Sequence, residues 1–232
     1  MEKPPPKKKH SPSSQRWLQR QHKDVFVQEA QKKNYRSRSA LKLLQLHEKY
    51  HFLKPQEKVL DLGCAPGGWC QVVCEVMLKK QKTIGLHQIV GIDIQKMLPI
   101  PGVTFLQEDI FHAAVLQHLR TMVPTGFHVV LSDIAPASTG MKKLDAARGI
   151  TLLESITDVM RHCLKVNGTF VVKIFHGYDG KYFVDTLKKV FSSVSYAKPA
   201  ASRKDSGEIY VVAEKFLGFP EEKGEKMFLS EL

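Results

Sequence analysis

The chain has 232 residues, of which 43% are hydrophobic, and its formal net charge at pH 7 is +12. This length and composition predict one α/β domain with a short extension, and no apolar run is long enough to span a membrane or to act as a secretion signal. The positive charge is concentrated in residues 1–42, which hold twelve Lys and Arg but only three acids. None of the four cysteines forms a C-x-x-C pair, so we expect reduced, mostly buried thiols and no metal site.

The N-terminal region combines a basic tail with two expected helices. Residues 1–14 are rich in Pro, Lys and Ser and are predicted to be a disordered basic tail. One helix is expected from about Trp17 to Lys33, and a second, capped by Ser37 or Ser39, up to about Tyr50. Lys42 falls beside the apolar face of the second helix. Cations mix with aromatics in Arg16, Trp17, Arg20, Tyr35, Arg36 and Arg38. That mixture suits phosphate contacts and base stacking on RNA, whereas a solvated face is the alternative for the first lysines.

The segment 58–69 predicts a buried strand, a tight glycine turn and the start of a helix. Gly63, Gly67 and Gly68 lack a Cβ, so the backbone there can turn sharply and approach a ligand closely. A dinucleotide loop would have the spacing G-x-G-x-x-G, but here Ala65 occupies the position of the second glycine. Open α/β sheets bind nucleotides at such a turn, although an ordinary strand-to-helix turn is the alternative.

The remaining chain alternates strands and helices, which predicts a mostly parallel sheet. The expected strands cover residues 58–62, 88–94, 103–106, 127–131, 169–175, 193–198 and 208–215, and the last two are expected to be antiparallel. The expected helices cover about 67–79, 112–122, 144–164 and 179–190. Asn167 and Gly168 are expected to end the third of these helices, and the loop 137–143 is a candidate substrate lid.

Acidic side chains follow three of the predicted strands. Asp93 ends the second strand, where a ribose diol would lie if the glycine turn holds an adenosine. Asp109 ends the third strand and is expected to accept a hydrogen bond from the adenine amino group, to cap the next helix, or both. Asp133 follows the fourth strand, so these acids are expected to meet at one edge of the sheet.

Four ionisable residues occupy positions that a core does not favour: Lys42, Asp133, Lys173 and Glu208. Lys173 interrupts an apolar strand, so its amine must reach an edge or be held by acids. Two cations and two anions can neutralise one another in a partly dry pocket. A structural ion-pair network is the alternative interpretation.

These features together resemble the FtsJ/RrmJ family of ribose 2′-O-methyltransferases over about residues 13–213. The resemblance is carried by residues 14–19, 35–43, 61–69, 132–136, 171–175 and 202–210. It implies a class I, Rossmann-like fold with a seven-stranded, mostly parallel sheet covered by helices on both faces, and S-adenosylmethionine as cofactor. It places the family's catalytic tetrad at Lys42, Asp133, Lys173 and Glu208, and its cofactor contacts at Gly67, Trp69, Asp93, Asp109 and Asp133. Cys64 stands where bacterial members commonly have alanine, a conservative difference.

The resemblance also implies a reaction and a substrate. A ribose 2′-hydroxyl is a poor nucleophile, so a nearby group must accept or steer its proton, and a neutral Lys173 amine beside the Lys42 cation would suit that role, with the two acids orienting the amines. The segment 13–19 looks most like bacterial-type enzymes, which modify a uridine in the aminoacyl-tRNA-binding loop of large-subunit ribosomal RNA within the assembled subunit. A tRNA 2′-O-methyltransferase and a non-catalytic ribosome assembly factor are the alternatives.

The expected organisation is a methyltransferase domain over residues 15–218, with RNA contacts on the helices of residues 17–50, and a C-terminal tail over 219–232. We expect a monomer without metal or membrane contact in the bacterial cytoplasm, with the mitochondrial matrix as the alternative location.

Overall fold

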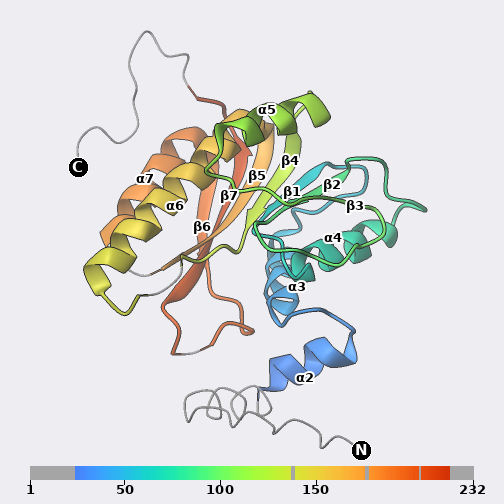
Figure 1. The fold of residues 1–232 in the computed structure, drawn as a ribbon, viewed down its shortest axis with the longest axis horizontal. Coiled ribbons are helices and arrows are strands. Elements are labelled where there is room, and N and C mark those ends of the chain that lie inside the picture. Colours follow the sequence, from blue (N-terminus) through green and yellow to red (C-terminus); the bar gives the residue numbers. More distant parts are fainter. Residues whose placement is uncertain (1–23, 137–138, 176–177, 204, 220–232) are drawn as a thin grey trace, which may run out of the picture.

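A seven-stranded sheet forms the centre of the computed structural model, which describes residues 24–136, 139–175, 178–203 and 205–219 (Figure 1). The strands are β1 (Val59–Leu62), β2 (Ile89–Ile92), β3 (Val103–Leu106), β4 (Phe127–Ser132), β5 (Leu164–Phe175), β6 (Phe191–Ala197) and β7 (Glu208–Phe216). Their order across the sheet is β3-β2-β1-β4-β5-β7-β6. Only β7 runs antiparallel to its neighbours, β5 and β6. The predicted mostly parallel sheet with an antiparallel final pair is therefore confirmed.

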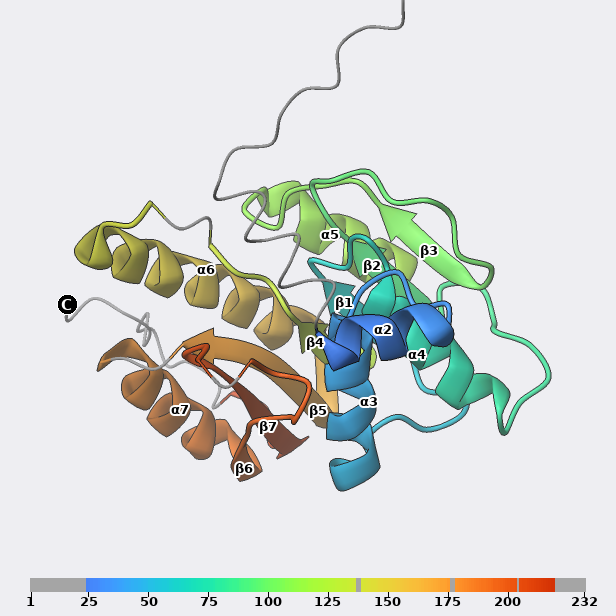
Figure 2. The same ribbon diagram turned by 90° about the horizontal axis from the view of Figure 1, so that it is seen from below.

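Helices cover both faces of this sheet, as predicted. They are α2 (Val25–Lys32), α3 (Ser39–Tyr50), α4 (Gly68–Leu78), α5 (Ala113–Met122), α6 (Lys142–Cys163) and α7 (Tyr178–Val190). In Figures 1 and 2, α5, α6 and α7 lie on one face, and α3 and α4 lie on the other. Successive side chains of a strand point to opposite faces, so Leu60 and Leu62 pack in the cluster with α5–α7, and Val59 packs in the cluster with α3 and α4.

Two predicted helix boundaries in the N-terminal half are wrong. The first helix cannot run unbroken from Trp17, because Asp24 has extended backbone (φ −78°, ψ 110°) and caps α2, its Oδ1 accepting from the Phe26 N–H at 3.1 Å. The second helix begins at Ser39 without a side-chain cap, because the hydroxyls of Ser37 and Ser39 bond to each other at 2.7 Å.

Two further local predictions are also wrong. Asp109 does not cap α5, which begins after His112; its carboxylate instead accepts from the Phe111 N–H at 3.0 Å and stabilises the turn before the helix. Asn167 and Gly168 do not end α6, which stops at Cys163. They lie inside β5, where Asn167 adopts a positive φ of 66° that asparagine tolerates better than most residues.

The four cysteines are free and buried, as expected. Among the described residues, no helix is both long and apolar enough to cross a membrane. The basic tail, Arg16, Trp17, Arg20 and the C-terminal tail after residue 219 lie outside the described residues, as does part of the proposed lid, residues 137 and 138.

Candidate active site

The glycine turn connects the carboxyl end of β1 to the first turn of α4. Gly63 (φ +73°) and Gly67 (φ +110°) adopt left-handed backbone that favours glycine. A Cβ on Gly63 would lie 2.2 Å from Cγ1 of Ile134, and one on Gly67 would lie 2.7 Å from Cδ1 of Ile100. Gly63 therefore requires glycine for space as well as for conformation, whereas at Gly67 the contacts are tips of flexible side chains and the positive φ is the main requirement.

Asp93 fixes the glycine turn from the neighbouring strand β2. Its Oδ2 accepts from the Ala65 N–H at 2.8 Å, and its Oδ1 accepts from the Gln95 N–H at 2.8 Å. Asp109 follows β3, the next strand, and is also only half-buried. A carboxylate offers about four acceptor positions, so each of these acids keeps capacity for a ligand.

Trp69, a predicted cofactor contact, is a core residue by its side chain. Trp69 is 2% exposed, and its indole lies 5.9 Å from the ring of Tyr210 at an interplanar angle of 37° and donates to the Ser39 carbonyl at 2.8 Å. The group of Trp69 that can contact a cofactor is therefore its backbone N–H, in the first turn of α4. N–H groups in that turn have no intrahelical acceptor and suit a carboxylate.

This arrangement fits S-adenosylmethionine. The acids after β2 and β3 offer acceptors for the hydroxyls and amine of an adenosine, and the N-terminus of α4 offers donors for the carboxylate of the methionine part. The glycine turn that connects them keeps its left-handed backbone at Gly63 and Gly67. Glycine spacing, the two acids and the helix start thus agree with the cofactor expected from the sequence.

The four predicted catalytic residues come together as two ion pairs at the same edge of the sheet. Lys42 on α3 bonds to Glu208 at the start of β7, with 2.6 Å between Nζ and Oε1. Lys173 on β5 lies with its Nζ 3.1 Å from Oδ1 of Asp133, and the same amine donates to the Asp133 carbonyl at 2.6 Å. The four side chains are between 8% and 17% exposed. The buried lysine of β5 is thus held by an acid.

Tyr210 joins the two pairs and was missed in the sequence. Its hydroxyl donates to Oδ1 of Asp133 at 2.6 Å, and the Lys42 amine lies 5.7 Å from the centre of its ring. Lys173 and Tyr210 are directly opposite each other on β5 and β7. The available signal was alternation, because Tyr210 shares a strand face with Glu208, two residues earlier. Burial and the charge of Asp133 raise the pKa of Tyr210, so it remains a donor.

The electrostatics keep Glu208 ionised. Burial alone would raise the pKa of Glu208, but the hydrogen bond and charge of Lys42, with the charge of Lys173 adding to them, outweigh burial and lower it below its ordinary value. Tyr210, which contacts both Asp133 and Lys42, joins the two ion pairs into one cluster.

A fifth acid lies beneath the glycine turn. Asp61 is 1% exposed, on the face of β1 that α4 covers, and its Oδ2 accepts from the Cys70 thiol at 3.2 Å. Burial raises the pKa of Asp61 to about 7, and the negative charges of Asp133 and Asp93 add to that effect. This carboxyl is therefore readily protonated near neutral pH.

Three predicted RNA contacts have partners within the protein. Tyr35 donates its hydroxyl to Glu75, and Arg38 bonds to Asp24 and to the backbone carbonyl of Ala201. Arg36 donates to backbone carbonyls, the first of them that of Pro66 at 3.1 Å. The structure thus gives all three side chains intramolecular roles.

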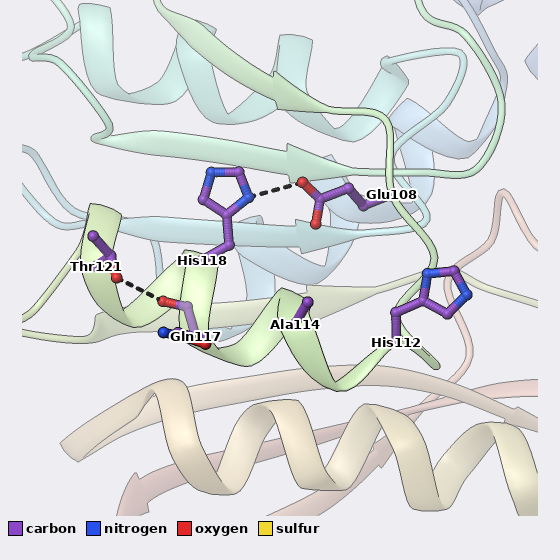
Figure 3. A pocket seen from close by; sticks show the side chains of 6 residues that line it. All are labelled: Glu108, His112, Ala114, Gln117, His118 and Thr121. Atoms are coloured by element: carbon purple, nitrogen blue, oxygen red, sulfur yellow. Dashed lines mark hydrogen bonds and ion pairs between the residues drawn. The ribbon is translucent and has the colours of Figure 1, made fainter.

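Two surface hollows lie away from the tetrad. One of about 500 Å³ follows α5 and is lined by Glu108, His112, Ala114, Gln117, His118 and Thr121 (Figure 3). His118 contacts Glu108 at 2.8 Å, and His112 lies apart from that pair. The other, of about 520 Å³, includes Lys58 and Gln88, which directly precede β1 and β2 at the opposite edge of the sheet. Within the described ranges no three His, Cys, Asp or Glu residues gather as a metal site would require.

Comparison with known proteins gives consistent matches over most of the chain. The family model described as FtsJ-like methyltransferase matches residues 35–216. Proteins named ribosomal RNA large subunit methyltransferase E are 44% identical in Rhodopseudomonas palustris, over 90% of this chain and 87% of the relative, and 44% identical in Paramagnetospirillum magneticum, over 92% and 87%. The crystal structure of a ribosomal RNA methyltransferase from Plasmodium falciparum is 36% identical, with a TM-score of 0.71, covering 80% of this chain and all of that one.

Proposed function

The chain belongs to the FtsJ-like methyltransferase family, and we propose on that premise that it methylates a ribose 2′-hydroxyl of large-subunit ribosomal RNA. The target within that RNA is a uridine of the aminoacyl-tRNA-binding loop in the assembled subunit. The names of the bacterial relatives support the RNA. The observation that carries the chemistry is the gathering of two lysine–carboxylate pairs beside the glycine turn.

When bound, S-adenosylmethionine supplies an electrophilic methyl group on a sulfonium. The protein's task is to place the ribose oxygen in line with that methyl and to provide for the hydroxyl proton. Asp93 and Asp109 would hold the adenosine, and Gly67 and the Trp69 backbone would hold the methionine end. These roles complete the cofactor site proposed for this chain.

Lys173 is suited to handle the hydroxyl proton. A neutral amine has two N–H donors and one lone pair. The carbonyl and carboxylate of Asp133 accept from the amine at 2.6 and 3.1 Å, which leaves the lone pair for the ribose hydroxyl. Lys42, held by Glu208 at 2.6 Å, places a second amine in the same cluster.

The test compares Lys173→Ala with the wild-type protein and with Lys189→Ala, an exposed lysine on α7 as matched control. We expect Lys173→Ala to bind S-adenosylmethionine in calorimetry as the wild type does, and to lose methyl transfer to undermethylated large subunits by about 100-fold or more. The control should retain both properties. Normal turnover by Lys173→Ala would refute its role.

Two outcomes of the same experiment favour the alternatives. Wild-type protein that binds ribosomal RNA and cofactor without transferring a methyl group would indicate a non-catalytic assembly factor. Transfer to transfer RNA in preference to large subunits would indicate a tRNA methyltransferase.

A further inference from the structure

Arg36 lies where three segments around the glycine turn meet. Its Nη1 donates to the Pro66 carbonyl at 3.1 Å and to the Leu98 carbonyl at 2.6 Å, and its Nη2 donates to the Pro99 carbonyl at 2.8 Å. Its backbone N–H donates to Oε1 of Gln71 on α4 at 2.8 Å. One half-buried side chain thus connects the entry to α3, the glycine turn and the loop after β2.

The loop of residues 94–101 covers the glycine turn. A Cβ on Gly67 would come within 2.7 Å of Cδ1 of Ile100 and 2.8 Å of Sδ of Met97, so both side chains lie directly against this glycine. The loop leaves β2 through Asp93, the proposed ribose contact, and contains no helix or strand. Its position relative to the glycine turn therefore depends on side-chain contacts.

Arg36 provides the polar part of these contacts. The Leu98 and Pro99 carbonyls both accept from its guanidinium, whose planar fork reaches adjacent acceptors that a single ammonium cannot reach together. Both hydrogens of Nη1 are used by carbonyls of different segments. A guanidinium bound in this way is pinned in place rather than directed toward a phosphate outside the protein.

We propose that Arg36 is a positioning residue of the cofactor site: it holds the loop of residues 94–101 against the glycine turn and thereby sets the affinity for S-adenosylmethionine. The proposal rests on the proposed function for the cofactor and its site. Arg36 precedes Lys42 by six residues, so the segment that enters the tetrad also closes the cofactor loop. This role differs from the RNA contact that its sequence neighbourhood suggests.

The experiment measures cofactor and RNA binding separately in Arg36→Met and Arg36→Lys. The matched control is Lys96→Met, which removes one exposed positive charge from the same loop. We expect the Kd for S-adenosylmethionine to rise about tenfold in Arg36→Met, because the binding-competent loop becomes a minority conformer. In Arg36→Lys the Kd should rise less, and in Lys96→Met it should stay within about twofold of the wild-type value.

Two further readouts separate this role from general destabilisation. At saturating cofactor, kcat for Arg36→Met should remain within about twofold while KM for cofactor rises, because the tetrad is untouched. Amide hydrogen exchange should accelerate in residues 94–101 of both Arg36 variants. If Arg36→Met does not fold, the proposal is tested by amide hydrogen exchange and cofactor affinity of Arg36→Lys.

Opposite results overturn the proposal. These are wild-type cofactor affinity in both Arg36 variants, or weakened RNA binding with a salt dependence reduced by about one phosphate contact and cofactor affinity intact. Failure of the proposed function would give a different result. The wild-type protein would then bind no S-adenosylmethionine, so there would be no wild-type Kd with which to compare the variants.

Discussion

Asp61 should make the stability of the protein fall as pH rises toward neutrality. Its pKa is raised from 3.8 to about 7 by burial beneath the glycine turn. Below about pH 4 the carboxyl is protonated in both the folded and unfolded states; between 4 and 7 only the folded state keeps the proton. The free energy of unfolding therefore decreases over that window by about 1.36 kcal/mol per pH unit, or about 4 kcal/mol in total. Above pH 7 the loss is complete and constant.

The Asp61→Asn variant isolates this contribution from those of other titrating groups. Asparagine keeps the size of the side chain and a polar partner for the Cys70 thiol, but has no charge to bury. In urea unfolding, the free energy of unfolding of the variant relative to that of the wild type should increase by about 4 kcal/mol from pH 4 to pH 8. The exposed Asp205→Asn variant is the control and should show a small, constant difference. A constant difference for Asp61→Asn as well would refute the argument that an uncompensated buried charge lies there.

Two further predictions concern the tetrad. Tyr210→Phe keeps the packing against Trp69 but removes the donor to Asp133; we expect single-turnover methyl transfer to slow by about tenfold or more, with thermal unfolding and cofactor affinity little changed, and an unaltered rate would contradict the linking role of the hydroxyl. Lys42→Met leaves the Glu208 carboxylate buried without its partner and should lower the free energy of unfolding by about 3 kcal/mol, whereas Lys42→Met combined with Glu208→Gln should recover most of that stability but no activity. If the single and double variants are equally stable in urea unfolding, Glu208 without Lys42 does not destabilise the protein as a buried, unpaired charge.

The sheet could be predicted because its strands are short apolar runs separated by turn signals. Both faces are covered, so β1, β2 and β4 are almost wholly buried, and β3 matched its predicted range. The boundaries that failed depend on local competition instead. Aspartate and serine both cap helices well, but the side chains of Asp109 and Ser39 instead hydrogen-bond to neighbours two residues away.

The tetrad could be located because its members are conspicuous by position. An acid at the end of a buried strand and a lysine within one both require partners, and the edge of the sheet supplies them. Arg36 carries no such signal, because in the sequence it is one of several arginines among aromatics. Its partners are carbonyls of two loops, and nothing in the identity of Leu98 or Pro99 indicates that their backbones accept from an arginine 62 and 63 residues away.

The charges of the molecule are arranged by sign in a way that suits two oppositely charged ligands. Within the tetrad two lysines meet two carboxylates, so it adds little net charge at the site of transfer. The excess at this edge is negative, and Asp93 and Asp133 already raise the pKa of the buried Asp61 by repulsion. A cationic cofactor held there offsets this repulsion, whereas a phosphate would increase it. We therefore expect RNA to be bound outside this edge, by the cations of residues 1–35, where nine Lys and Arg stand against three acids, with only the ribose reaching the tetrad.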